Sequence, residues 1–193
     1  MASRLASCLC IVVATTVYAQ TPAPETPHPG LVRVQTETAE SRALWDRRLA
    51  RMVRAGALKV REERVVSPTA RDQWLDQLHK GVPVVGGDVW RHVEAGALTA
   101  AEGTIYEKID VNPVPKLTRL EARAAVTALQ PGSAGPSRPP DLVVLPTADG
   151  HYVLAYRARV FTGPTLVLYY LDASTGAVVL TDATSGAPPP ASR

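Results

Sequence analysis

The stretch that decides the fold is "HKGVPVVGGDVWRHV", His79 to Val93. It contains a proline, a double glycine and two histidines, so it is either a site of chemistry or a device that shapes a sheet. Gly81 and Pro83 punctuate it, and Gly86-Gly87 interrupts it before "DVWRHVE" continues as a predicted strand. Ala95-Gly96 can turn the chain back into residues 97–108, the second strand of a predicted hairpin.

The residues of this stretch do not form a known catalytic motif. A zinc hydrolase of the commonest type needs two histidines one helical turn apart with a glutamate between them, and neither His79 nor His92 has such a partner. Gly86-Gly87 lacks the lysine and the following helix of a phosphate loop. Because the chain also contains no His-Glu-x-x-His sequence, we expect no enzymatic activity, no cofactor and no metal.

The N-terminal residues predict export. Arg4 precedes an apolar run, and Val17-Tyr18-Ala19 ends in the small residues that signal peptidase reads, so residues 1–19 are expected to be a signal peptide. Both cysteines, Cys8 and Cys10, lie inside it. Residues 20–38 are expected to be a proline-rich linker. The mature protein should be secreted or periplasmic and not held in the membrane, and a formal charge of +3 gives no reason to expect nucleic-acid binding.

A helix is predicted over residues 38–56. Leu44, Trp45, Leu49, Met52 and Val53 gather on one side, and Gly56 is a suitable C-terminal stop. The opposite side is basic, with Arg47, Arg48, Arg51 and Arg54. Two interpretations remain open for this basic side: a solvated surface, or a docking face for an acidic partner formed by Arg47, Arg51 and Arg54.

The remaining elements repeat the same order. Residues 58–66 alternate as in a strand, whereas residues 71–80 fit either a helix that begins after Ser67-Pro68 or a second strand. In the second half, Thr118 and Glu121 form a capping box for a helix that ends near Leu129. Four short strands then follow. The sequence therefore predicts an α+β fold of two consecutive subdomains, each with one helix packed on an antiparallel sheet.

The central stretch resembles the fungalysin/thermolysin propeptide domain, which belongs to the pro-region of secreted zinc metallopeptidases. The matching residues follow in the order Gln77, Gly81, Val82, Pro83, Val84, Gly86, Gly87 and Asp88. The second half is similar to the propeptide-and-YpeB (PepSY) domain that usually follows, on "LTRLEARAAVTAL", "LAYRARV" and the turn from Asp172 to Gly176. The resemblance favours a strand over residues 71–80. It divides the chain into a propeptide-like domain at 39–112 and a PepSY-like domain at 113–182. The composition of the last residues predicts a disordered tail at 183–193.

In this family the pro-region helps its peptidase to fold and blocks the cleft. The resemblance therefore implies a secreted, non-enzymatic protein that binds the catalytic domain of a thermolysin-like zinc metallopeptidase in trans, as an inhibitor, a folding chaperone or both. Two alternatives stay open. The chain can be the pro-region fragment of a zymogen whose catalytic domain is missing, or a stand-alone extracytoplasmic module that binds extended peptides.

Overall fold

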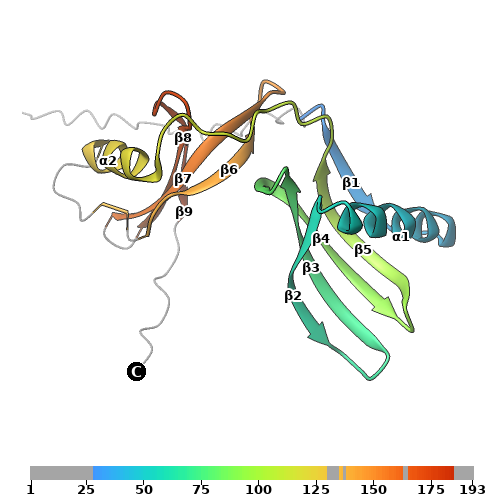
Figure 1. The fold of residues 1–193 in the computed structure, drawn as a ribbon. Coiled ribbons are helices and arrows are strands. Elements are labelled where there is room, and N and C mark those ends of the chain that lie inside the picture. The colour runs from blue at the N-terminus through green and yellow to red at the C-terminus, as the bar shows by residue number, and fades with distance from the viewer. Residues whose placement is uncertain (1–27, 130–134, 137, 163–164, 185–193) are drawn as a thin grey trace, which may run out of the picture.

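The computed structural model describes residues 28–129, 135, 136, 138–162 and 165–184. The predicted signal peptide, most of the predicted tail and the first part of the predicted linker lie outside these residues. The elements are β1 (Leu31–Gln35), α1 (Ala39–Arg54), β2 (Leu58–Val65), β3 (Ala70–His79), β4 (Val82–Glu94), β5 (Ala97–Tyr106), α2 (Arg119–Leu129), β6 (Asp141–Pro146), β7 (Tyr152–Thr162), β8 (Thr165–Asp172) and β9 (Val178–Thr184) (Figure 1).

The strands form one nine-stranded sheet with the order β1-β5-β4-β6-β7-β8-β9, and β2 and β3 continue from β4. All neighbours are antiparallel except β4 and β6, which pair in parallel at Val84 and Val144. Figure 1 shows two lobes that meet at this point. We name α1 with β1 to β5 the N-terminal lobe, and α2 with β6 to β9 the C-terminal lobe.

The predicted fold class, α+β with two helix-on-sheet subdomains, is wrong. Of the described residues, 52% are in strands and 18% are in helices, so the protein is mostly β. A single sheet passes through both halves because β4 contributes to each of them. Pairing between strands so far apart along the chain has no local sequence signal, and the repeated helix-then-strands order therefore suggested two separate units.

Helix α1 covers one face of the N-terminal lobe. Thr38 caps it, with the Thr38 side chain accepting from the Ser41 backbone N–H, and Gly56 follows its end at φ +70°. Trp45 and Leu49 pack into a core with Leu75 and Val89, while Met52 and Val53 are partly buried against it. Leu44, which we expected on the packed side, is 56% exposed.

Two tight turns connect the central strands of this lobe. Lys80-Gly81 between β3 and β4 has φ angles of 49° and 87°, and Ala95-Gly96 between β4 and β5 has φ angles of 47° and 83°. Two consecutive positive φ angles are typical of the two-residue hairpin turn whose twist matches that of the strands. The predicted hairpin at Ala95-Gly96 is confirmed.

Residues 70–79 form strand β3, so the resemblance was right where the local pattern favoured a helix. Gln73, Leu75 and Gln77 point to the buried side, and two of these three side chains are polar. A strand is recognised in a sequence by apolar residues at every second position. Two of the buried positions of β3 are glutamines, so the sequence did not show this alternation. Residues 31–35, which we assigned to the linker, form β1 and pair with β5.

The C-terminal lobe packs α2 against β7. Thr118 and Glu121 make the predicted capping box, with the Glu121 backbone N–H donating to the Thr118 hydroxyl at 3.2 Å. Val126 of α2 packs with Ala158, Val160, Tyr169 and Leu171 of the sheet. Within the described part of the chain, neither helix is long and apolar enough to cross a membrane.

Candidate functional site

The glycine motif, residues 81–88, lies where the pairing of β4 with β3 is interrupted. Pro83 pairs with Leu78 of β3 on one side of the interruption, and Asp88 pairs with Asp76 of β3 on the other. Residues 84–87 therefore lie opposite Gln77 alone, and Val84 pairs instead with β6 of the other lobe. The motif allows one strand to take part in both lobes.

The side chain of Gln77 bonds the backbone of β5 at the point where β4 no longer pairs with it. The ladder between β4 and β5 ends at Asp88 and Thr104. Beyond it, the Gln77 Nε2 donates to the Tyr106 carbonyl at 2.6 Å, and the Tyr106 backbone N–H donates to Gln77 Oε1 at 2.7 Å. Gln77 is only 4% exposed, so its amide provides a buried substitute for one pair of sheet hydrogen bonds.

Gly87 makes this arrangement possible. A Cβ at position 87 would lie 2.7 Å from Gln77 Oε1 and 2.9 Å from Gln77 Cβ, which is closer than real contacts. Gly86 has a φ of +72°, a conformation that side chains disfavour. Val82 and Val84 are buried in the core that the lobes share, while Pro83 and Asp88 are exposed. Most of the motif therefore has an evident structural role.

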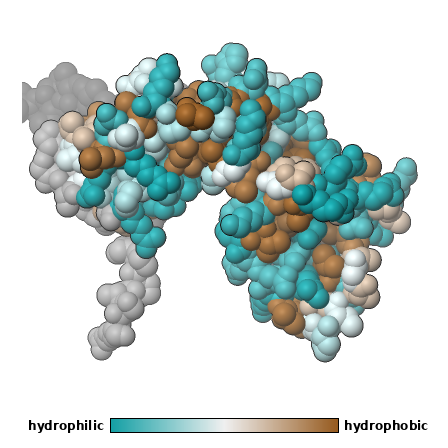
Figure 2. All heavy atoms as spheres, in the orientation of Figure 1, coloured by the Kyte–Doolittle hydropathy of each residue, from teal (hydrophilic) through white to brown (hydrophobic). Residues whose placement is uncertain are grey.

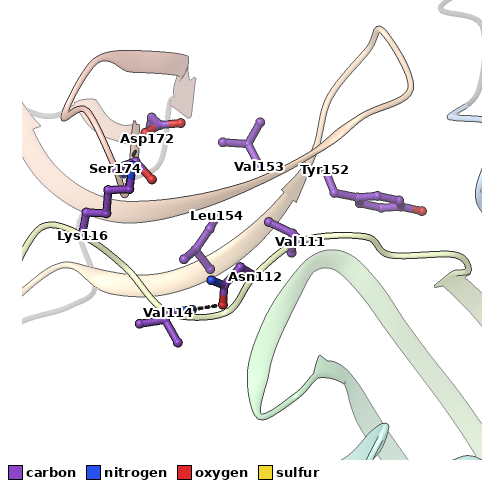
Figure 3. A pocket seen from close by; sticks show the side chains of 9 residues that line it. All are labelled: Val111, Asn112, Val114, Lys116, Tyr152, Val153, Leu154, Asp172 and Ser174. Atoms are coloured by element: carbon purple, nitrogen blue, oxygen red, sulfur yellow. Dashed lines mark hydrogen bonds between the residues drawn. The ribbon is translucent and has the colours of Figure 1, made fainter.

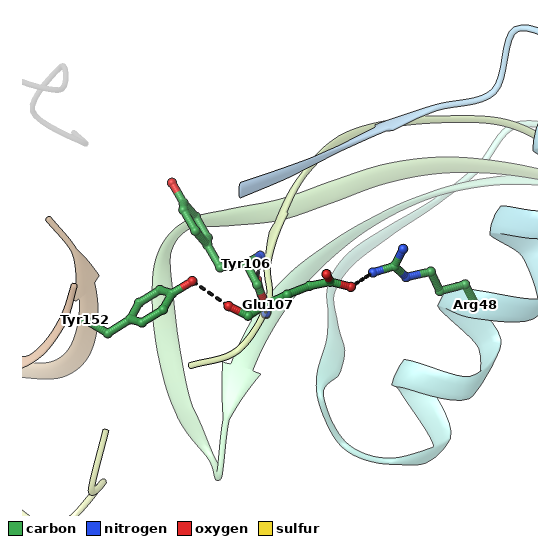
Figure 4. A network of polar contacts seen from close by, with 5 residues as sticks. Arg48, Tyr106, Glu107 and Tyr152 are labelled. Carbon is green, nitrogen blue, oxygen red and sulfur yellow. Dashed lines mark hydrogen bonds and ion pairs between the residues drawn. The ribbon is translucent and has the colours of Figure 1, made fainter. Parts of the chain in front are cut away.

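A polar and aromatic network joins the same junction to helix α1 (Figure 4). Tyr106 of β5 meets Tyr152 of β7 edge to face, with ring centroids 6.2 Å apart. The Tyr152 hydroxyl donates to the Glu107 carbonyl at 2.7 Å, and the Glu107 carboxylate pairs with Arg48 of α1. Burial raises the pKa of Tyr106, and the nearby Asp88 carboxylate raises it further. Burial likewise raises the pKa of Tyr152, with smaller contributions from Tyr106 and Glu107.

A pocket of about 300 Å³ lies beside the junction, between the segment after β5 and strand β7. Figure 3 shows Asn112 and Val114 beside Leu154, with Lys116 and Ser174 at one end and Tyr152 at the other. Asn112 Oδ1 accepts from the Val114 backbone N–H at 3.1 Å. None of the lining residues is a histidine or a cysteine, so Ser174 has no histidine base beside it in the pocket.

The predicted site residues of the C-terminal lobe lie at the turn that forms one end of this pocket, which Asp172 and Ser174 line. Asp172 and Gly176 bound the turn between β8 and β9, where Asp172 Oδ1 accepts from the backbone N–H groups of Ser174 and Thr175, each at 2.8 Å. Gly176 takes a φ of +77° there. This turn is structural, and it packs on the segment before α2 through Lys116 N–H and the Ala173 carbonyl at 3.0 Å.

The predicted docking arginines are exposed on α1. Arg47, Arg51 and Arg54 form no ion pair with any described residue. Arg48, by contrast, lies over the Trp45 ring with its guanidinium carbon 4.7 Å from the ring centroid, and it pairs with Glu107. The structure thus leaves the predicted three arginines available, and whether they bind a partner stays a prediction.

The two histidines of the opening stretch have separate partners. His79 Nε2 lies 3.0 Å from the Val111 carbonyl, and His92 Nδ1 lies 2.6 Å from Asp72 Oδ1. Across residues 28–129, 135–136, 138–162 and 165–184, no group of three or more histidine, cysteine, aspartate or glutamate residues is arranged to hold a metal ion.

The free edges of the sheet are a feature that the sequence patterns did not single out. Strands β1, β2 and β9 each pair with one neighbour among the described residues. The β2 sequence LKVREERV carries charges along most of its length, which protects an edge from unwanted pairing. Strand β9 instead exposes Val178, Val179 and Leu180 by 42%, 38% and 45%. The apolar run "AVVLT" was the available signal, but it does not tell an edge strand from a central one.

The comparisons with known proteins identify no family for this chain. No protein-family profile and no curated protein matches this sequence. Among solved structures, the chain is similar to the Bacillus megaterium YpeB C-terminal domain, with a TM-score of 0.41 and 12% identity. The match covers 77% of this chain and 66% of that domain, so the chain spans slightly less than two thirds of its length.

The structural similarity is weak. The name of the matched YpeB domain agrees with the resemblance of residues 113–182 to the propeptide-and-YpeB domain. A TM-score of 0.41 is too low to carry an argument. None of these comparisons supports the fungalysin/thermolysin propeptide domain or a propeptide role.

Proposed function

We propose that this protein is an extracytoplasmic binding module that pairs an extended segment of a protein partner along the free edge of β9. The observation that carries the proposal is the character of this edge. It exposes three consecutive apolar side chains, Val178 to Leu180, and no described strand pairs with its outer side.

An unpaired edge recognises extended chains in a simple way. Its backbone N–H and C=O groups bond the incoming strand, and exposed side chains on both faces add apolar contact. Asp182 is the single charged residue in β9, so little opposes such pairing. Strand β2 differs, because its charged residues disfavour the approach of an apolar strand.

The proposed partner is the catalytic domain of a thermolysin-like zinc metallopeptidase. Two sequence features support this choice: the order of residues from Gln77 to Asp88, which resembles the propeptide family, and the predicted signal peptide at residues 1–19, which would export the chain. A folded module that binds the native peptidase stabilises it by mass action, and a strand paired beside its cleft blocks substrate. The module would thus act as an inhibitor, a folding chaperone or both.

The direct test is to titrate residues 20–193 against a thermolysin-like peptidase. We expect slower cleavage of a peptide substrate, a higher yield when the peptidase refolds, or both. The variant carrying Val178→Lys and Leu180→Lys should weaken either effect, since lysines on an edge oppose pairing. The matched control is Leu120→Lys on α2, where the side chain is 76% exposed and far from the edge in sequence.

Two results would contradict the proposal. If neither cleavage nor refolding changes, the peptidase is not a partner. If the β9 variant acts like the unmodified chain, the edge is not the binding site. Capture of unrelated extended peptides by the unmodified chain, without any effect on the peptidase, would support the stand-alone peptide-binding module instead.

A further inference from the structure

The face of the N-terminal lobe that points away from α1 carries an aromatic row. Glu62 pairs with Trp74, Trp74 with Trp90, and Trp90 with Glu102, so one row crosses β2, β3, β4 and β5. Their neighbours Leu75 and Val89, which are 0% exposed, point to the α1 side. Since successive residues of a strand point to opposite faces, the row Glu-Trp-Trp-Glu lies on the other side.

The rows beside it add more carboxylates. In the row on one side, Asp76 of β3 lies opposite Asp88 of β4. In the row on the other side, Asp72 lies opposite His92, with Asp72 Oδ1 2.6 Å from His92 Nδ1. Arg61 pairs with Asp76 at 2.8 Å. Two like charges directly opposite each other on a sheet are unfavourable, and of these two carboxylates only Asp76 has a cation, Arg61, beside it.

Three carboxylates of this face have no cationic partner. Glu62, Asp88 and Glu102 form no ion pair with any described residue. The arginines and lysines that share the face lie on the edge strands, at Arg33 of β1 and at Lys59, Arg61 and Arg64 of β2. The central strands therefore present negative charge around the two tryptophans.

Trp90 occupies the centre of this arrangement. Asp88 and His92 flank it along its own strand, Glu102 lies opposite on β5, and Trp74 lies opposite on β3. The rings of Trp74 and Trp90 are half-buried, so part of each remains open to solvent. The face of an indole ring attracts the charge of a lysine or arginine placed over it, and flanking carboxylates add ionic attraction.

We propose that this face binds a basic segment of a protein partner, with arginine or lysine side chains placed over Trp90 between Asp88 and Glu102. The charge of the face selects the occupant, because an acidic segment would meet unpaired carboxylates. A second copy of this chain is a poorer occupant. Its basic face is α1, on the opposite side of the lobe, so such contacts would join two unlike surfaces and form a ring or an open chain of copies instead of a two-fold dimer.

The probe is a synthetic hexapeptide of alternating arginine and threonine, with a glutamate-threonine hexapeptide as its counterpart. Calorimetry and tryptophan fluorescence should show binding of the basic peptide alone, and the binding should weaken as salt rises. The variant with Asp88→Asn and Glu102→Gln keeps the shape of both side chains and should bind about tenfold more weakly. The variant Trp90→Leu should weaken binding and remove most of the fluorescence change.

The control variants make the same charge change elsewhere, Asp182→Asn on β9 and Glu40→Gln on α1, and should bind as the unmodified chain does. Circular dichroism confirms that each variant is folded. Equal binding of the acidic peptide, or unchanged binding by the Asp88/Glu102 variant, would overturn the proposal. Self-association that the same two substitutions abolish would also overturn it, in favour of a second copy. The β9 lysine variant tests the proposed function separately, since it leaves this face intact.

Discussion

The side-chain amide of Gln77 occupies the space that a Cβ at position 87 would take. The two residues act as a pair, because the amide reaches the Tyr106 backbone only across a residue without a side chain. The resemblance singled out both positions, and their order in the sequence gave no indication of why they occur together. Packing explains it: the bulge in β4 leaves backbone groups of β5 unpaired, and a buried amide must satisfy them.

Because Gln77 and Gly87 depend on each other, the stability costs of substituting them should not add. Gly87→Ala should destabilise the fold by about 1–3 kcal/mol, since the new methyl overlaps the Gln77 side chain. When Gln77→Ala is already present, the added cost of Gly87→Ala should fall below about 1 kcal/mol because the overlap is gone. Urea denaturation of the four proteins measures the coupling. Strictly additive costs would show that the two residues do not depend on each other.

Tyr106 predicts a change in stability at high pH. Burial and Asp88 raise its pKa above the ordinary value of 10.0, so the unfolded chain loses this proton first as pH rises. The free energy of unfolding that this raised pKa contributes is fully present below about pH 10 and is lost as the pH rises through the pKa of the folded state. Tyr106→Phe cannot titrate, so it should lose less stability than the unmodified protein between pH 9 and pH 11. Urea denaturation across that range checks this, and parallel curves for the two proteins would contradict it.

At the scale of single elements, local signals predicted the helices and most strands well. The caps Thr38 and Thr118 act within one turn of their own helix, so the residues that form them are close in sequence. Strand β3 shows the limit of such signals. Its two buried glutamines have partners on Glu63, Arg91 and Tyr106, far along the chain, and only the assembled sheet makes them suitable for an interior.

The α2 cap gives a prediction at this scale. Thr118→Ala removes the hydroxyl that accepts from the Glu121 backbone N–H, so the protein should lose about 1 kcal/mol of stability. The midpoint of urea denaturation should fall without a change in slope. An unchanged midpoint would show that α2 is held by its packing on β7 alone.

At the scale of the whole molecule, the two lobes share a strand and part of a core. Val82 and Val84 of β4 pack with Val144 of β6 and Ala122 of α2, so residues from both lobes complete one cluster. Figure 2 shows an open notch below this join, where the lobes are separate masses. Val84 is one of several residues that connect the lobes, together with Tyr106 and Tyr152.

The shared cluster predicts cooperative unfolding. All three tryptophans lie in the N-terminal lobe, whereas four of the five described tyrosines, Tyr152, Tyr156, Tyr169 and Tyr170, lie in the C-terminal lobe. Tryptophan fluorescence therefore follows the N-terminal lobe, and tyrosine absorbance follows mainly the C-terminal lobe. Both signals should change at one urea concentration. Val84→Ala should lower both midpoints together, at a cost of about 1–3 kcal/mol. A shift of only one signal would show that the lobes unfold independently.

The amino-acid sequence by itself determined the capped helices, the glycine turns and the alternating strands, because each depends on residues within a few positions of one another. It also carried the order of residues from Gln77 to Asp88. Only the tertiary structure decided that β4 belongs to two lobes, that β9 is a free edge, and that Trp74 and Trp90 meet in one row between carboxylates. Each of these depends on which strands lie side by side. That choice is made by the burial of the whole chain, in which residues far apart in sequence complete one sheet.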